Sequence, residues 1–294
     1  MKKEKICFDQ SKWFFEKEVP YDTSRISIGI EIKKKLYAGR SPFQKIDFYD
    51  TYSFGRILTL DDIVQTSEQD EFIYHEMICQ VPMFLHKNPK KVLIVGGGDG
   101  GSLEEILKHP IERVWMVEID GKVVELCQKY LPSISKDAFK DKRAEVIIGD
   151  GQKLIKQYKN FFDVIILDLS DPDGPAKNLI STGFYQQVKK ALRPGGIVSI
   201  QSGSLTCQPD LVKTIYQRIK KIFPSAEVRS AVVPTYEAGE YSFIIGAKAD
   251  LKKIKLSDIE KKYKKLKLNL RYYYPEISFS TKVLPDYLRR HLSV

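Results

Sequence analysis

The chain has 294 residues, of which 43% are hydrophobic and 29% charged, and this composition excludes a fibrous or intrinsically disordered protein. Its length allows one large domain with a smaller attachment and no need for disulfide bonds. The four cysteines form neither a C-x-x-C pair nor a zinc-finger spacing, and no stretch approaches the roughly 20 apolar residues that a bilayer requires. We therefore expect a cytoplasmic protein with reduced thiols and no membrane partner.

The net charge of +10 raises the question of a nucleic-acid partner, and the distribution of that charge argues against one. Residues 252–267 carry eight lysines and two acids, a net charge of +6. Ile259, Tyr263 and Leu266 recur there at helical spacing, so these lysines are predicted to form the solvated face of one amphipathic helix. Residues 95–175, by contrast, hold fifteen acids and eleven bases, a net charge of −4. Without a stripe of interleaved aromatic and basic residues, an RNA-binding module is disfavoured.

The first 65 residues are predicted to form a small N-terminal β-rich domain. Turn residues separate short apolar and aromatic runs that are typical of strands. These runs occupy residues 13–15, 26–32, 46–49 and 54–60.

A helix is predicted to follow and to open a second domain, residues 66–294. Ser67 with Asp70 three residues later forms a capping signal. Pro82 is expected to bend or shorten the end of this helix. Its apolar stripe consists of Ile73, Met77, Val81 and Phe84.

Beyond residue 89 strands alternate with helices. Near-continuous apolar strands separated by amphipathic helices indicate a parallel sheet that is covered on both faces. Two last strands, 226–234 and 241–248, are only six residues apart and are expected to be antiparallel. The predicted fold class is therefore α/β: a Rossmann-like, methyltransferase-type sheet with helices on both faces, plus the N-terminal β-rich domain. The other predicted strands occupy 91–98, 113–120, 144–151, 162–169 and 195–203.

A glycine-rich loop indicates where a ligand binds, because ligands of an open α/β sheet lie beyond the carboxyl ends of its strands. The sequence GGGDGG at 96–101 lies between a predicted strand and a predicted helix and satisfies G-x-G-x-x-G. Glu118, twenty residues beyond Gly98, ends the next strand, where an acid usually accepts hydrogen bonds from ribose hydroxyls. We therefore expect a reactant that contains adenosine.

Carboxylates around this loop favour a cationic reactant. Asp99 lies inside the loop and would repel the pyrophosphate of a dinucleotide, which disfavours NAD. Asp150 ends the third strand, and Asp168, Asp171 and Asp173 surround the end of the fourth. Decarboxylated S-adenosylmethionine has lost the carboxylate of the intact form and carries two uncompensated positive charges, and a polyamine adds more. The acidic rim therefore favours decarboxylated S-adenosylmethionine as co-substrate, with no prosthetic group.

Several of these residues also have a purely structural interpretation. Asp99 could cap a helix, Asp150 could satisfy a turn, and Asp171 before a proline could begin one. His75 and Glu71, four residues apart, could equally form an ion pair on the surface of a helix. Tyr236 taken alone could equally be a residue that only packs against its neighbours.

The spacing of Asp168, Asp171 and Asp173 could also indicate a binding site for a divalent metal ion. An EF-hand requires a carboxylate at the twelfth position from Asp168, and that residue is Leu179. No histidine lies nearby in sequence, so we expect no metal site. A nucleophile elbow, a P-loop and zinc-type histidine spacing are also absent from the sequence.

Taken together, these motifs resemble the spermidine synthase, or polyamine aminopropyltransferase, family over most of the chain. The resemblance implies transfer of the aminopropyl group of decarboxylated S-adenosylmethionine to putrescine, which gives spermidine and methylthioadenosine, in a homodimer or homotetramer. Agmatine, cadaverine or spermidine are alternative acceptors, and a methyltransferase on the same sheet is a more distant alternative. The matching motifs are SPFQ at 41–44, QTSEQDEFIYHEM at 65–77, GGGDGG at 96–101, EID at 118–120, GDG at 149–151, DLSDPDGPA at 168–176 and PTY at 234–236.

The resemblance also implies a role for each matching residue. Asp168 would be the catalytic residue, and with Asp99 it would hold the aminopropyl amine and the reacting centre. The residues implied to hold the nucleoside part of the donor are Gln44, Glu118, Asp150, Gly151 and Pro175. Those implied to line the acceptor site are Gln65, Tyr74, His75, Asp171 and Tyr236.

The chain departs from the family pattern at several positions, most of which are expected near the acceptor. These departures bear on the identity of the amine acceptor more than on the type of reaction. These positions are Asp62, Leu169, Asp173, Glu237 and Ser278.

Overall fold

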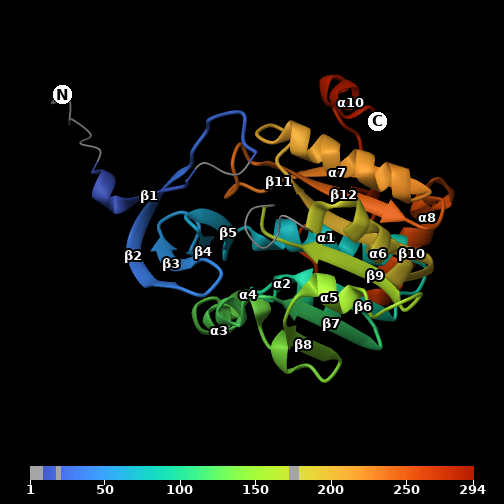
Figure 1. The fold of residues 1–294 in the computed structure, drawn as a ribbon, viewed down its shortest axis with the longest axis horizontal. Coiled ribbons are helices and arrows are strands. Elements are labelled where there is room, and N and C mark those ends of the chain that lie inside the picture. Colours follow the sequence, from blue (N-terminus) through green and yellow to red (C-terminus); the bar gives the residue numbers. More distant parts are fainter. Residues whose placement is uncertain (1–8, 18–20, 172–178) are drawn as a thin grey trace.

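The protein folds into two sheets, one formed by the N-terminal residues and one by the rest of the chain (Figure 1). The computed structural model describes residues 9–17, 21–171 and 179–294. The predicted α/β fold class, with its Rossmann-like sheet and small N-terminal β module, is confirmed.

The N-terminal sheet has five strands in the order of the sequence, each antiparallel to the next. One face, with Ile46, Phe48 and Leu58, packs against Leu126 and its neighbours on helix α3 (Gly121–Tyr130). This contact joins the N-terminal sheet to the rest of the protein. The strands are β1 (Trp13–Phe15), β2 (Gly29–Arg40), β3 (Lys45–Thr51), β4 (Arg56–Leu60) and β5 (Ile63–Ser67).

The junction after this sheet differs from the prediction. Ser67 is the last residue of β5, which the sequence analysis did not predict, and it does not cap helix α1 (Glu71–Leu85). The N-cap position belongs to Asp70, whose Oδ1 accepts a hydrogen bond from the Ser67 hydroxyl at 2.6 Å. The helix continues past Pro82 to Leu85, so the proline does not end it.

The larger sheet has seven strands in the order β11-β12-β10-β9-β6-β7-β8. From β10 to β8 neighbouring strands are parallel. The last two strands, β11 and β12, are antiparallel to each other as predicted, and β12 is antiparallel to β10 as well. The chain leaves the central strand β6 toward β7 and β8 on one side and later returns to β9 on the other. Such a switch point opens a crevice at the carboxyl ends of the strands. The strands are β6 (Lys91–Gly96), β7 (Arg113–Glu118), β8 (Ala144–Ile148), β9 (Phe162–Asp168), β10 (Leu192–Gly203), β11 (Ser225–Val232) and β12 (Glu240–Ala247).

Both faces of this sheet are buried, which explains its continuous apolar strands. In β6, Val92 and Ile94 face the core that contains α1 and α2 (Gly101–Leu107), while Leu93 and Val95 face the core of α6 (Thr182–Ala191) and α7 (Pro209–Ile222). The remaining helices are α4 (Pro132–Ser135), α5 (Gly151–Ile155), α8 (Leu256–Leu266), α9 (Ile277–Ser280) and α10 (Asp286–Leu292), with short 3-10 helices η1 (Gln10–Lys12), η2 (Ala138–Lys140) and η4 (Leu251–Lys253).

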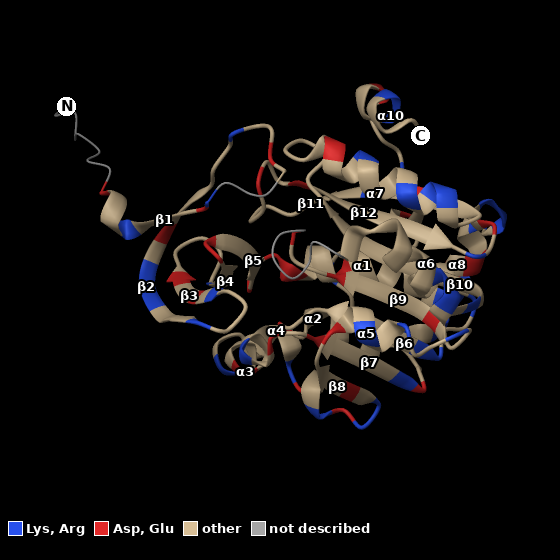
Figure 2. Ribbon diagram, in the orientation of Figure 1, with Lys and Arg blue, Asp and Glu red and all other residues tan. Residues whose placement is uncertain are grey.

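The lysine-rich segment forms the short helix η4 and helix α8, with Ile259 buried against the core and seven of its eight lysines exposed (Figure 2). Lys262 departs from the predicted solvated face, because it is half-buried and donates to the carbonyl oxygens of Met83 and His86. Cys79, Cys127 and Cys207 are buried and free of disulfides. No helix in the described part of the chain combines the length and the apolar character that crossing a membrane demands.

Candidate active site

A cavity of about 280 Å³ lies at the carboxyl ends of the parallel strands, and residues of the N-terminal sheet complete its wall. Seven carboxylates and no lysine, arginine or histidine are among the described residues that line it. The structure therefore brings the predicted acidic rim together in one place. The carboxylates are those of Glu16, Asp99, Glu118, Asp150, Asp168, Asp171 and Glu237.

Ten of the twelve predicted site residues line this cavity. His75 lies behind the wall, and Pro175 falls outside the described residues. The ten are Gln44, Gln65, Tyr74, Asp99, Glu118, Asp150, Gly151, Asp168, Asp171 and Tyr236.

The glycine-rich loop is shaped by the residues that pack against it. Gly96 has φ +86°, and a Cβ atom there would lie 2.0 Å from the carbonyl oxygen of Asp168. A Cβ on Gly101 would lie 2.2 Å from the ring of His75. Only glycine fits at either position, because the backbone of Asp168 and the buried ring of His75 are both held in place.

Asp168, at the end of β9, receives a hydroxyl on each carboxylate oxygen. Tyr74 donates to Oδ1 and Ser102 donates to Oδ2, both at 2.6 Å. Burial raises the pKa of Asp168, and the charge of Asp99 adds to this effect, although His75 and the two hydroxyls oppose it. Asp168 is thus fixed in orientation and is a better proton acceptor than an exposed aspartate.

Asp99 is held in its charged form by a buried histidine. His75 is 1% exposed, with Nδ1 at 2.7 Å from Glu71 Oε2 and Nε2 at 3.4 Å from Asp99 Oδ2. Burial lowers the pKa of His75, but the two carboxylates outweigh it and raise that pKa well above its usual value. Burial likewise raises the pKa of Asp99, but His75 and the Gly101 amide outweigh it and leave that pKa below the usual range. His75 is therefore a buried imidazolium and not the surface pair that the sequence left open.

The end of the cavity next to β7 combines Glu118 with a residue from the N-terminal sheet. Gln44 Nε2 donates to Asp120 Oδ2 at 2.9 Å, and the Ser41 hydroxyl donates to the same oxygen at 2.6 Å. Burial raises the pKa of Glu118 to about 7, although its Oε1 accepts a hydrogen bond from the Asp120 amide. Asp150 caps helix α5 through Oδ1, so it has a structural role and also lines the cavity.

The opposite end is formed by Asp171 and a group of tyrosines. Asp171 accepts hydrogen bonds from the side-chain amides of Gln201, at 3.2 Å, and Gln208, at 2.9 Å. Tyr236 donates to the carbonyl oxygen of Gln65 at 2.6 Å, and its ring lies 5.8 Å from that of Tyr74. The ring of Tyr236 therefore packs against Tyr74 and also lines the cavity.

Two glutamates at this end have unusual acidity. Burial, together with the charges of Glu237 and Asp171, raises the pKa of Glu16 to about 8, although a hydrogen bond from the Val64 amide opposes the shift. Burial and the charges of Asp22 and Asp171 raise the pKa of Glu237 to about 7. No lysine or arginine contributes to either shift, so these carboxylates lack a cation of the protein's own among the described residues.

Sequence reasoning missed several polar residues of this site. Ser102 lies one residue beyond the GGGDGG loop, and Gln201 lies near the carboxyl end of a strand, where the strand-end rule could have found both. Asp120 ends the predicted strand 113–120, so the same rule could have found it. Glu16 and Gln208 carry no such signal, because only tertiary packing brings them to the cavity.

Among the departures from the family pattern, Leu169 and Glu237 line the cavity. Asp62 and Ser278 do not. Asp62 adopts a left-handed φ of +67° in the turn between β4 and β5, a conformation that glycine takes most easily. Ser278 is buried beside Tyr273, and their hydroxyls are 2.5 Å apart. Asp173 lies outside the described residues.

A seven-stranded sheet of this order, with a polar cavity at the carboxyl ends of its parallel strands, defines the protein as a Rossmann-like enzyme. Comparison with known proteins specifies the family. Residues 71–258 match the family model described as the spermine/spermidine synthase domain. Residues 12–68 match the spermidine synthase tetramerisation domain, which agrees with the expected homo-oligomer.

Similar proteins and structures cover nearly the whole chain. A polyamine aminopropyltransferase of Thermoanaerobacter sp. (strain X514) is 42% identical over 279 residues, covering 94% of this chain and 97% of that protein. One of Clostridium tetani is 43% identical over 260 residues, covering 88% and 90%. A spermidine synthase in complex with the transition state analogue AdoDATO has a TM-score of 0.90 and 38% identity, covering 97% of this chain and 96% of that one. The spermidine synthase of Thermotoga maritima has a TM-score of 0.88 and 37% identity, covering 96% and 94%.

The chain therefore belongs to the spermidine synthase, or polyamine aminopropyltransferase, family, and it is a transferase.

The charged state of His75 can be tested directly. We expect His75 to remain protonated at pH values where an exposed histidine is neutral, and Glu71→Gln to lower its pKa because one of its two anionic partners is lost. The measurement is an NMR titration of the four histidines, with the His75 signal assigned by its loss in His75→Asn. His86 and His109, whose pKa values burial lowers, serve as internal controls and should not respond to Glu71→Gln. A His75 signal that titrates like an exposed histidine would contradict the assignment.

Proposed function

We propose that this enzyme transfers the aminopropyl group of decarboxylated S-adenosylmethionine to putrescine, giving spermidine and methylthioadenosine. The observation that carries the proposal is a cavity lined by seven carboxylates and, among the described residues, by no cationic side chain. Buried carboxylates without cations favour a positively charged ligand. The decarboxylated donor and the amine acceptor are both cations, whereas the carboxylate of intact S-adenosylmethionine would meet no cationic side chain among the described residues that line the cavity.

In this proposal the donor lies along the wall formed by β6, β7 and β8. Glu118 accepts hydrogen bonds from the ribose hydroxyls, and Gln44, Asp150 and Gly151 contact the nucleoside. Asp99 binds the amine of the aminopropyl group, and the buried imidazolium of His75 keeps Asp99 charged for this role. His75 is therefore a positioning residue. The predicted contact of Pro175 with the nucleoside lies outside the described residues.

The acceptor lies between Asp168 and Asp171, beside Tyr74, Tyr236 and Gln65. A neutral amine nitrogen attacks the carbon next to sulfur, so that the C–N bond forms, the C–S bond breaks and the electron pair of that bond neutralises the sulfonium. Freeing a proton from an ammonium with pKa about 10.4 costs roughly 4 to 5 kcal/mol at pH 7. Asp168 receives or directs this proton, and its raised pKa and two fixed hydroxyl partners suit it for the task. Alignment of the two reactants supplies much of the remaining acceleration.

A second candidate acceptor is an amine with more positive charge than putrescine. Glu16 and Glu237 add two carboxylates to the Asp171 end of the cavity. Agmatine, cadaverine and spermidine therefore belong in any acceptor test. We also propose a cytoplasmic location. The match of residues 12–68 to the tetramerisation domain supports a further proposal, that the protein is a tetramer.

The proposed reaction is tested with purified protein, decarboxylated or intact S-adenosylmethionine, and a panel of the four amines. We expect methylthioadenosine only with the decarboxylated donor and spermidine as the product from putrescine, both identified by mass spectrometry. Methyl transfer from the intact donor would overturn the proposal, and a preferred product from another amine would replace putrescine.

The role of Asp168 is tested by Asp168→Asn. This change keeps the size of the side chain but removes the proton acceptor, so we expect kcat to fall by roughly 10²- to 10⁴-fold. Donor affinity, measured by calorimetry, should change little. The matched control is Asp163→Asn on the same strand, because Asp163 bonds the Lys90 and Lys91 amides away from the cavity. A kcat within about threefold of wild type would exclude Asp168 as the catalytic residue.

The charge-matching role of Asp99 is tested by Asp99→Asn. We expect affinity for decarboxylated S-adenosylmethionine to fall about 10- to 100-fold, because a charge-assisted hydrogen bond to its amine is lost. Methylthioadenosine, which lacks the aminopropyl amine, should bind within about twofold of wild type. Calorimetry with both ligands gives the two values. An equal loss for both would mean that Asp99 shapes the nucleoside site and does not recognise the amine.

A further inference from the structure

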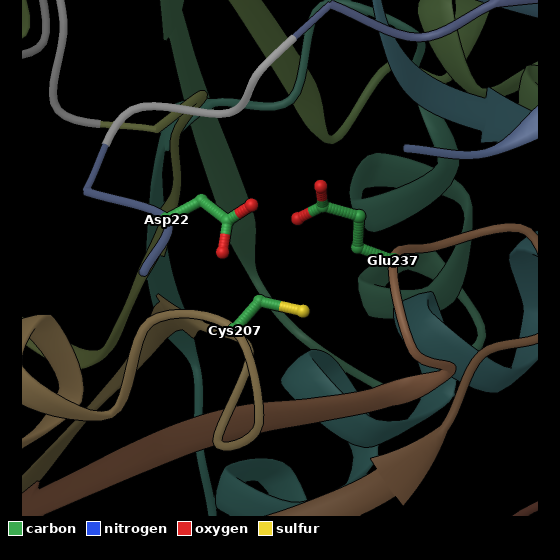
Figure 3. A group of neighbouring side chains, drawn as sticks. All are labelled: Asp22, Cys207 and Glu237. Carbon is green, nitrogen blue, oxygen red and sulfur yellow. The ribbon is translucent and has the colours of Figure 1, made fainter. Parts of the chain in front are cut away.

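A group of three metal-ligating side chains lies at the Asp171 end of the cavity, where Glu237 lines the cavity and the other two lie beyond its lining. Asp22 comes from the connection between β1 and β2, Cys207 from the loop after β10, and Glu237 from the loop between β11 and β12 (Figure 3). One ligand atom of each lies within 4.8 Å of the others. Figure 3 shows the three side chains converging from separate segments on a shared space.

Two oxygen atoms of this group are buried without a hydrogen-bond partner in the described part of the chain. Glu237 is 5% exposed, and its Oε1 has no partner among the described residues, although the Cys207 thiol hydrogen-bonds to the Glu237 carboxylate. Oδ2 of Asp22 is likewise buried without a partner there, while Oδ1 accepts the Ser24 amide at 2.6 Å. Leaving a buried polar atom unpaired is unfavourable, and more so if the atom is charged. A cation between these two oxygens would pair both of them.

We infer that Asp22, Cys207 and Glu237 form a binding site for a thiophilic divalent cation of the Zn²⁺ class. Two carboxylate oxygens and a sulfur are suitable zinc ligands, and a water can complete a tetrahedron. Ligand atoms around a tetrahedral zinc lie roughly 3.4 to 3.6 Å apart, so the side chains need to move by only about 1 Å. The sulfur excludes Mg²⁺ and Ca²⁺ as natural occupants, because these prefer oxygen ligands alone. Binding converts the Cys207 thiol to a thiolate and releases its proton to solvent.

The site has a structural consequence for the cavity. The backbone already joins two of the three segments, since the Thr23 amide donates to the carbonyl oxygen of Cys207 at 3.0 Å. A metal ion would add a bond to the third segment, which carries Tyr236 beside Glu237. It would thus tie the N-terminal sheet to the loop that completes the Asp171 end of the cavity.

A second group with possible ligands, His75, Asp99 and Asp168, is already explained by its own contacts. His75 pairs with Glu71, and both oxygens of Asp168 accept hydroxyl hydrogen bonds. The expectation of no metal arose from the spacing of Asp168, Asp171 and Asp173. It did not consider Asp22, Cys207 and Glu237, because these are too far apart in sequence to form a motif.

The test uses the full chain, stripped of metal with a chelator and titrated with Co²⁺ and then Zn²⁺. We expect one Co²⁺ per chain and a near-ultraviolet band from thiolate-to-cobalt charge transfer, which Zn²⁺ displaces. Zn²⁺ should also raise the thermal unfolding temperature. Cys207→Ser should abolish the band, and Glu237→Gln should weaken Co²⁺ binding at least tenfold.

Two control variants separate this site from others. Cys79→Ser removes a different buried thiol, and Glu240→Gln removes a nearby acid outside the group, so both should keep the band and the affinity. If Cys207→Ser does not fold, Asp22→Asn, at a less buried position, should weaken Co²⁺ binding at least tenfold, as Glu237→Gln does. Absence of stoichiometric binding, or a charge-transfer band retained in Cys207→Ser, would overturn the inference. Metal binding is measured without donor or amine, so its outcome is independent of the proposed reaction.

Discussion

The structure depends on keeping several carboxylates together in one cavity that no described lysine or arginine lines. Asp99, Asp168 and Asp171 lie at the ends of parallel strands, where the strand order brings separate loops to one edge of the sheet. Burial and mutual repulsion make such a group unfavourable on its own. The protein tolerates it because hydroxyls, amides and one buried imidazolium hold these three carboxylates. In the proposed function a cationic ligand relieves the remaining repulsion.

Each member of the group is stabilised in a different way, and this separates their roles. Asp99 is kept charged by His75, which suits a binding residue. The pKa of Asp168 is raised by burial and by Asp99, which suits a residue that receives a proton. The pKa values of two carboxylates in one cavity are thereby shifted in opposite directions, as general acid–base chemistry requires. Two small residues of the glycine-rich loop make this possible by leaving room for the backbone of Asp168 and the ring of His75.

The N-terminal sheet is part of the site as well as the region that matches the tetramerisation domain. Ser41 and Gln44 both bond to Asp120, the N-cap of α3, so the sheet is fixed to the central fold at the cavity wall. Glu16, which directly follows β1, and Gln65, in β5, reach the other end of the cavity. The region that matches the tetramerisation domain therefore also shapes the Asp171 end of the cavity.

The sequence by itself determined the α/β class, the Rossmann-like type of the larger sheet and the acids at its strand ends, because those features follow local periodicity and one topological rule. It also identified Asp99 and Asp168 as neighbours through their position after β6 and β9. Only the tertiary structure decided that Ser67 ends a strand, that His75 is a buried imidazolium, and that Asp22, Cys207 and Glu237 meet. These depend on contacts between segments far apart in the chain, and no short-range pattern encodes such contacts.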